Sequence, residues 1–454
     1  LVAGDGGLVQ QLLAALPFTL TAAQQRVTEE IAADLARARP MNRLLQGDVG
    51  SGKTVVAALA ACTAIDAGWQ CALMAPTEIL ASQHFARISE WLAPLLAARG
   101  QGVAWLTGSQ KRSERTAALD AIASGQAALV IGTHAVIEQQ VQFARLALAI
   151  IDEQHRFGVA QRLALRQKSS EGGENIEPHL LMMSATPIPR TLAMSHFADL
   201  DVSTIDALPP GRKSVATRLF DQQRRDEVIA RLASHIAQGR QVYWVCPLIE
   251  ESEALDLRNA TETHATISAA LPGCGVGLLH SRMGAADKRA VMQRFVRGET
   301  PVLVSTTGIE VGVDVPAASV MVIEHAERFG LSQLHQLRGR VGRGAEAAVC
   351  ILLYGAPDGA GRLTDTARER LKTMRESSDG FEIARRDLAL RGPGEFLGAR
   401  QSGAALLRFA DINADAPLLR WAHRAAPLML EQWPDMAARH IDRWIGAKAE
   451  YLKA

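Results

Sequence analysis

The sequence lacks long apolar runs, paired cysteines and an excess of charge of either sign. No uninterrupted apolar stretch reaches about 18 residues, the length needed to cross a membrane. The five cysteines are scattered and form no Cys-x-x-Cys pair, which argues against a zinc or disulfide framework and favours reduced thiols in the cytoplasm. The 49 lysines and arginines nearly balance the 48 aspartates and glutamates, so any nucleic acid must bind local patches rather than a uniformly basic surface.

The chain does contain two long regions in which short apolar runs alternate with amphipathic stretches. Buried strands followed by helices are typical of parallel sheets, so we predict an α/β fold with two parallel-sheet lobes in tandem. Between them, Pro209-Pro210-Gly211 indicates a linker. We place the first lobe at 1–207, the linker at 208–214, the second lobe at 215–356 and a helical C-terminal region at 357–454.

Three local features refine this outline. Thr21 is expected to cap a helix, with Gln24 as its capping-box partner. Residues 388–403 (LALRGPGEFLGARQSG) are interpreted as a Gly/Arg-rich loop. In the helical tail we expect a set of apolar residues to face a core: Leu418, Leu419, Trp421, Leu428 and Leu430.

A phosphate-binding loop is predicted at 47–54, where GDVGSGKT follows a strand-like run and opens an apolar helix. Its glycines let backbone N–H groups converge on phosphate oxygens at a helix N-terminus. Lys53 would reach the β- and γ-phosphates, and the Thr54 hydroxyl would hold Mg²⁺. A Gly-rich turn before a buried helix is the alternative. The candidate nucleotide-binding residues are Gly47, Asp48, Gly50, Ser51, Gly52, Lys53 and Thr54.

Two acidic residues follow the apolar run 146–151. A carboxylate at a strand end can hold Mg²⁺ through water, and its neighbour can orient or deprotonate the attacking water. We assign these roles to Asp152 and Glu153, with an ordinary acidic surface pair as the alternative.

Arginines separated by glycines occur at 336–343 (QLRGRVGR), within the predicted second lobe. Arg340 and Arg343 suit the stabilisation of charge on a transferring phosphoryl group. A solvated basic turn is the alternative. If these arginines serve a site on the first lobe, the two lobes must close over a cleft, and ATP must make different contacts in the open and closed states.

Eight segments, in order, resemble the motifs of superfamily-two helicases: FTLTAAQ (18–24), APTEIL (75–80), GTHAVI (132–137), DEQH (152–155), SATP (184–187), LLHSRM (278–283), STTGIEVGVDVP (305–316) and QLRGRVGRG (336–344). Longer segments at 44–57, 152–162, 183–194, 323–344 and 387–403 resemble the RecG family of bacterial DNA helicases. This resemblance implies RecA-like lobes followed by a translocation motif, a helical hairpin with a loop. The related transcription-repair coupling factor usually has another residue at the Ser51 position and reads DEE where this chain reads DEQ (152–154).

The resemblance also implies roles for single residues. Phe18 and Gln24 would read adenine, and Gly312 and Asp314 would line the nucleotide. Backbone contacts to DNA would come from both lobes, which fits the low aromatic content of 5%. Ser184 and Thr186 would link the ATP and DNA sites, and Arg391 and Gln401 would couple lobe closure to DNA movement. The implied DNA contacts are Thr77, Glu78, Thr133, His134, His280, Thr306 and Thr307.

By this resemblance we expect an ATP- and Mg²⁺-dependent translocase on double-stranded DNA that reverses stalled forks and migrates Holliday junctions in recombination and repair. Its partners would be double-stranded and branched DNA and single-stranded DNA-binding protein, with no membrane contact, and the protein would be a cytoplasmic monomer. We expect the chain to be the motor portion, without the N-terminal wedge domain of RecG-like proteins. The alternatives are a coupling-factor motor that pushes RNA polymerase and an ATP-gated DNA clamp without turnover.

Overall fold

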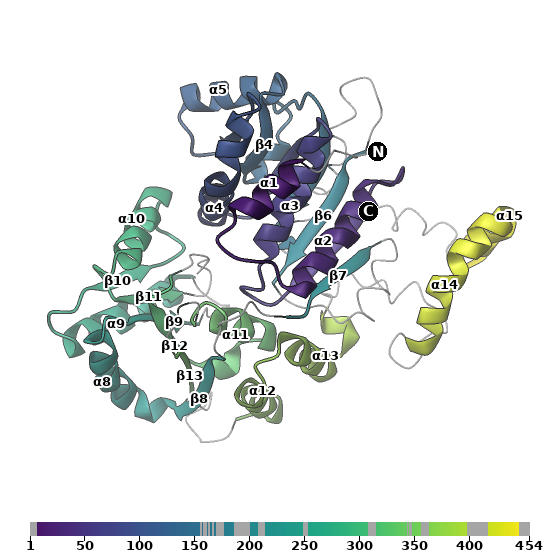
Figure 1. Ribbon diagram of the computed structural model, residues 1–454. Helices are drawn as coiled ribbons and strands as arrows, with labels where there is room; N and C mark the ends of the chain where they lie inside the picture. Colours follow the sequence, from purple (N-terminus) through teal and green to yellow (C-terminus); the bar gives the residue numbers. More distant parts are fainter. Residues whose placement is uncertain are drawn as a thin grey trace.

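Two α/β lobes follow one another in the structure, a computed structural model (Figure 1). The first lobe lies above the second in this view, and a pair of helices, α14 and α15, lies to the right of both. The fold class predicted from the sequence is confirmed. The structure describes residues 7–154, 157, 161, 164–165, 168, 177–185, 200–207, 214–247, 253–306, 315–342, 344, 347–355, 363–396 and 416–444.

The first sheet has seven parallel strands among the described residues, in the order β3-β4-β2-β5-β6-β1-β7. Most strands of this sheet are buried along their whole length. Because successive side chains of a strand point to opposite faces of the sheet, both faces are apolar. The strands are β1 (Asn42–Gly47), β2 (Gln70–Met74), β3 (Gly102–Leu106), β4 (Ala127–Gly132), β5 (Leu146–Ile151), β6 (His179–Ser184) and β7 (Asp201–Ile205). The edge strand β7 was not predicted, because DVSTI alternates too weakly to stand out.

One face of this sheet is covered by four helices that share a core with it: α1 (Gly7–Ala15), α2 (Ala22–Leu35), α3 (Lys53–Asp66) and α4 (Glu78–Ala97). A further first-lobe helix, α5 (Arg112–Ala123), packs on β3 and β4. The predicted capping box is confirmed: Gln24 N–H donates to Thr21 Oγ1, and Thr21 N–H donates to Gln24 Oε1.

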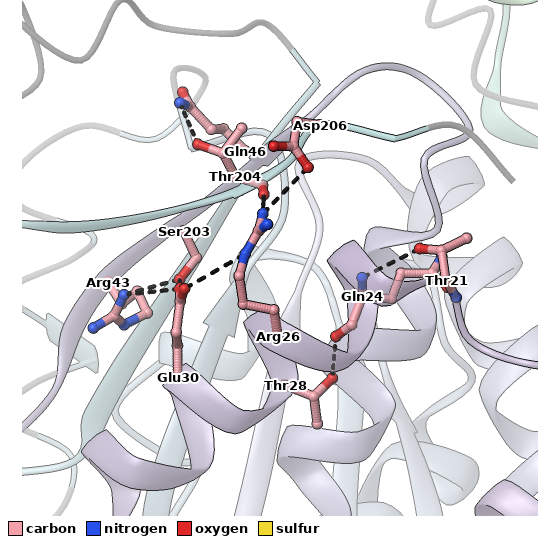
Figure 2. A network of polar contacts seen from close by, with 10 residues as sticks. All are labelled: Thr21, Gln24, Arg26, Thr28, Glu30, Arg43, Gln46, Ser203, Thr204 and Asp206. Atoms are coloured by element: carbon pink, nitrogen blue, oxygen red, sulfur yellow. Dashed lines mark hydrogen bonds and ion pairs between the residues drawn. The ribbon is translucent and has the colours of Figure 1, made fainter.

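A polar network fixes α2 to β1 and β7 (Figure 2). Arg26 donates to the Thr204 carbonyl at 2.8 Å and pairs with Asp206 at 3.2 Å. Arg43, on β1, bridges Asp34 of α2 and the Ser203 hydroxyl of β7. The helix that carries Gln24 is thereby held against the strand that leads into the predicted linker.

The second sheet has six parallel strands among the described residues, in the order β10-β11-β9-β12-β13-β8. They are β8 (Ala216–Asp221), β9 (Gln241–Cys246), β10 (Val276–Leu279), β11 (Val302–Thr306), β12 (Ala318–Ile323) and β13 (Val349–Tyr354). Two helices share a core with one face, α8 (Arg225–Ile236) and α9 (Glu253–Ala270). The opposite face packs on α10 (Ala285–Val296) and α11 (Leu331–Arg338).

A helical hairpin, α12 (Asp365–Glu376) and α13 (Gly380–Phe396), packs on α11. Leu371 and Met374 of α12 and Ile383 of α13 extend the core of the second lobe. The predicted loop at 388–403 is wrong in its first half, because α13 continues through Phe396 despite the glycines.

The tail forms α14 (Ala416–Gln432) and α15 (Pro434–Trp444), which pack on each other. The prediction that its apolar residues face a core is wrong for Leu418, Trp421, Leu428 and Leu430, which are more than half exposed. Among the described side chains of these two helices only Ala437 is buried. Helical periodicity reports an apolar face but not what covers it. No helix in the described part of the chain is long and apolar enough to span a membrane.

Candidate nucleotide and DNA site

The phosphate-binding loop connects β1 to the first residue of α3, Lys53. Gly50 and Gly52 have φ of 77° and 89°, values that favour glycine. Gly52 is also needed for space, since a Cβ there would lie 2.1 Å from Gln24 Nε2. The backbone of the loop is therefore shaped by its glycines, as the motif predicts.

Lys53 points back into its own loop. Its Nζ donates to the carbonyls of Gly47 at 2.7 Å and Asp48 at 3.1 Å. These acceptors are neutral, and a phosphate oxygen would bind the ammonium more strongly because it is charged. Thr54 follows in the first turn of α3.

Gln24 is buried, and both ends of its amide are engaged. Nε2 donates to the Ser51 carbonyl at 2.9 Å, and Oε1 accepts the Thr21 N–H. The predicted adenine reader thus braces the phosphate loop. Phe18 is partly exposed and packs edge-on against Trp91 of α4, with 6.2 Å between ring centroids.

Asp152 and Glu153 lie where β5 ends, and both are buried. Asp152 Oδ1 accepts the Glu153 N–H at 3.0 Å, and Oδ2 lies 2.7 Å from Nε2 of His84 on α4. Burial alone would raise the pKa of Asp152, but His84, Lys53 and the Glu153 N–H together hold that pKa below its usual range. The carboxylate is therefore ionised at neutral pH.

Glu153 has φ of 50°, a left-handed conformation that a non-glycine residue adopts only at a cost. Such strain is concentrated at functional sites, where the surrounding structure imposes it. Glu153, which is predicted to orient or deprotonate the attacking water, is therefore held in an unusual backbone conformation.

The second lobe contacts the phosphate loop directly. His335 Nε2, on α11, lies 2.7 Å from Asp48 Oδ1, and a Cβ on Gly339 would lie 2.8 Å from the Val49 side chain. Arg340 follows Gly339 and is half-buried. The helix that directly precedes the predicted arginines is thus seated on the predicted phosphate site. Arg343 lies outside the described residues.

Arg338, which the sequence interpretation passed over, is buried. It donates to His335 Nδ1 at 3.0 Å and to the carbonyls of Met374 at 2.9 Å and Ser377 at 2.8 Å, where α12 ends. Because arginine only donates, Nδ1 of His335 accepts and its Nε2 donates to Asp48. Arg338 therefore fastens the hairpin to the helix that contacts the phosphate loop. A buried arginine in a run of arginines has no distinguishing signal in the sequence.

The predicted DNA residues of the first lobe differ in exposure. Thr77 caps α4, accepting the Leu80 N–H at 3.4 Å, and His134 is exposed. Thr133 is buried, and its hydroxyl has no hydrogen-bond partner among the described residues. Glu78 accepts from Ser109 and pairs at 3.6 Å with Arg289 of the second lobe.

In the second lobe, His280 is half-buried, and burial with the nearby Lys288 and Arg282 lowers its pKa. Thr306 is buried at the end of β11, and its hydroxyl has no hydrogen-bond partner among the described residues. Ser184 ends β6 and is buried. Arg391 lies on α13, and its side chain is not among the described parts of the structure. Outside the described residues lie Thr186, Thr307, Gly312, Asp314 and Gln401.

Three family models match the chain: DEAD/DEAH box helicase at 21–195, Helicase conserved C-terminal domain at 224–345, and ATP-dependent DNA helicase RecG, domain 3, C-terminal, at 377–442. The chain is 55% identical over 446 residues to the ATP-dependent DNA helicase RecG of Acidithiobacillus ferridurans, covering 98% of this chain and 63% of that protein. It belongs to the RecG helicase family.

Two further relatives support this membership. The RecG of Escherichia coli (strain K12) is 54% identical, covering 98% of this chain and 63% of that protein. A solved structure, RecG bound to a three-way DNA junction, is 44% identical with a TM-score of 0.73, covering 92% of this chain and 52% of that chain. The chain therefore spans somewhat less than two thirds of the curated relatives it matches, and its two lobes have the RecA-like architecture of the family.

Proposed function

We propose that this chain is an ATP-driven motor that moves along double-stranded DNA, and that the RecG protein it represents uses this movement to reverse stalled forks and migrate Holliday junctions in recombination and repair. The observation that carries the proposal is the contact of α11 with the phosphate loop, through His335 on Asp48 and Gly339 on Val49. A nucleotide bound by this loop would lie beside the second lobe.

Each residue has a distinct task in this proposal. Lys53 leaves its carbonyl partners and binds the β- and γ-phosphates. Glu153 orients the attacking water and accepts its proton, while Arg340 and Arg343 stabilise charge on the transferring phosphoryl group. Phe18 and Gln24 contact the base, and Gly312 and Asp314 lie along the nucleotide.

Mg²⁺ fits the oxygen donors of this site. Thr54 offers a hydroxyl in the first turn of α3, and Asp152 offers an ionised carboxylate. Mg²⁺ typically takes one or two protein oxygens together with substrate phosphates and water. When bound it would neutralise charge on the phosphates. The protein's share is to hold the Asp152 carboxylate in place.

DNA would be gripped along its backbone by both lobes, at Thr77, Glu78, Thr133, His134, His280, Thr306 and Thr307. Ser184 and Thr186 would pass changes at the nucleotide to this surface, and Arg391 and Gln401 would turn lobe closure into movement. The hairpin's attachment through Arg338 supports this route. We further propose branched DNA and single-stranded DNA-binding protein as partners, and a monomeric motor.

The test is ATP turnover by this chain with forked, duplex and single-stranded DNA, measured beside the full-length protein. We expect duplex DNA to stimulate turnover in both proteins, with a weaker preference for forks in this chain. Glu153→Gln should abolish turnover and retain ATP binding. Equal stimulation by RNA and DNA duplexes, or normal turnover by Glu153→Gln, would contradict the proposal.

A further inference from the structure

His84 occupies an unusual place on α4. The buried residues Leu80, His84, Ile88 and Leu92 recur every four positions, so they form one stripe facing the sheet. A histidine therefore stands where the helical pattern calls for an aliphatic residue. A buried polar group costs stability unless it is hydrogen-bonded, so its partner is the point of interest.

That partner is Asp152. His84 is 8% exposed and Asp152 is 8% exposed, and Nε2 lies 2.7 Å from Oδ2. Because an ionised carboxylate only accepts hydrogen bonds, Nε2 carries the proton and donates. The other oxygen, Oδ1, accepts the Glu153 N–H. Asp152 is thus held at both oxygens, one by the next residue and one by a helix that follows the neighbouring strand.

We propose that His84 is a positioning residue, which fixes the rotamer of the Asp152 carboxylate so that it can hold Mg²⁺ at the nucleotide site. The proposal rests on the proposed function, since it assumes that Asp152 takes part in Mg²⁺ binding. Ligating carboxylates need hydrogen-bond partners of their own, and loss of such a partner typically costs about 10- to 100-fold in metal affinity.

Two substitutions separate positioning from simple packing. His84→Gln places an amide N–H at about the reach of Nε2, whereas His84→Leu fills similar space without a donor. His84→Asn is too short to reach Oδ2 and serves as the donor-deficient variant should the leucine variant fail to fold. A matched control is His264→Gln in the second lobe, whose Nε2 bonds the Val276 carbonyl far from this site.

The measurement is the Mg²⁺ concentration that half-saturates binding of fluorescent N-methylanthraniloyl-ADP to the purified chain, together with the melting temperature without nucleotide. We expect His84→Leu and His84→Asn to raise that concentration by about 10- to 100-fold, and His84→Gln and His264→Gln to stay within about threefold. In EDTA, without Mg²⁺, the weaker residual affinity for the nucleotide should be the same in every variant.

A lowered melting temperature with unchanged Mg²⁺ dependence in His84→Leu and His84→Asn would overturn the proposal and leave His84 a packing residue. The proposed function would instead be refuted if the unmodified chain failed to bind the fluorescent nucleotide, or if DNA did not stimulate its ATP turnover. The two failures are therefore distinguishable.

Discussion

The two lobes have sheets of the same strand order, and they differ at the start of the helix that follows the first strand. Counted from the first strand of each lobe, both sheets have the order 3-4-2-5-6-1, with β7 added at the edge of the first. An acidic residue directly follows the fifth strand in both, Asp152 after β5 and Glu324 after β12. The next residue has a positive φ in both, 50° at Glu153 and 49° at His325.

The cation at the start of the first crossover helix shows the difference. Lys53 begins α3 after the glycine loop, and Arg225 begins α8 after the short turn Gln222–Arg224. Lys53 is held by two neutral carbonyls of its loop. Arg225 instead binds the Glu324 carboxylate directly and also donates to Thr263.

This difference supports placing the proposed nucleotide site in the first lobe and not in the second. A phosphate can replace neutral carbonyls around a lysine because it gains the charge interaction they lack. A phosphate that displaced the Glu324 carboxylate from Arg225 would leave this buried carboxylate unpaired and next to the negative charge of the phosphate. The glycine loop supplies the backbone donors as well. The shared scaffold therefore carries the proposed nucleotide site in the first lobe and an internal ion pair at the equivalent place in the second.

The largest expected effect is on turnover. Lys53→Ala should lower DNA-stimulated ATP turnover by at least about 100-fold, since it removes charge stabilisation of the transferring phosphoryl group. Arg225→Ala, at the equivalent position, should change turnover per folded molecule by less than about threefold. Steady-state phosphate release measures both. A comparable loss of turnover in the two variants would contradict the proposed difference between the lobes.

The next effect is on stability, where the substitution in the second lobe is expected to cost more than the one in the first. Arg225→Leu should lower the free energy of unfolding by about 2–4 kcal/mol, because it leaves the buried Glu324 without its partner. Lys53→Leu removes the hydrogen bonds to two loop carbonyls and a charge interaction with Asp152, and should cost less, about 1 kcal/mol. Urea unfolding followed by circular dichroism measures the difference. The double variant with Glu324→Leu should recover part of the loss, and no recovery would mean that packing dominates.

A third prediction concerns acid. His179, at the start of β6, accepts the Met41 N–H through Nδ1, and burial lowers its pKa from 6.5 to about 4. Above pH 6.5 it is neutral in both the folded and the unfolded chain. Between pH 6.5 and about 4 only the unfolded chain takes up the proton, so stability falls as pH falls, by up to about 2–3 kcal/mol. The corresponding strand of the second lobe begins with Val349.

Urea unfolding at several pH values checks this prediction. His179→Asn should remove most of the loss between pH 6.5 and 4, and His264→Asn in the second lobe should not. An unchanged slope in His179→Asn would assign the acid sensitivity to another group.

The smallest effect is expected at the contact between the lobes. Asp48→Asn and His335→Leu should each reduce DNA-stimulated turnover by a few-fold, since either weakens the seating of α11 on the phosphate loop. Combined in a double-mutant cycle, they should show a coupling of about 0.5–1.5 kcal/mol. Strict additivity in the cycle would show that the contact is not used during turnover.

Most of the fold could be predicted from the sequence, because the strands of a parallel sheet are buried on both faces and therefore have near-continuous apolar sequences. The runs at 42–47, 146–151 and 241–246 became β1, β5 and β9. The capping box at Thr21 and Gln24 depends on neighbours in sequence and was also predictable. The edge strand β7, the helical course of 388–396 and the exposed face of α14 were not, because each depends on distant packing.

What the sequence determined by itself was the set of local devices: the glycine loop, the acidic strand end and the arginine run, since each is specified by residues a few positions apart. Only the tertiary structure decided which side chains meet them. His84 reaches Asp152 over 68 positions and His335 reaches Asp48 over 287, and no local pattern encodes contacts of that range. The same is true of the second lobe, where Arg225 and Glu324, 99 positions apart, form an ion pair at the place equivalent to the proposed nucleotide site.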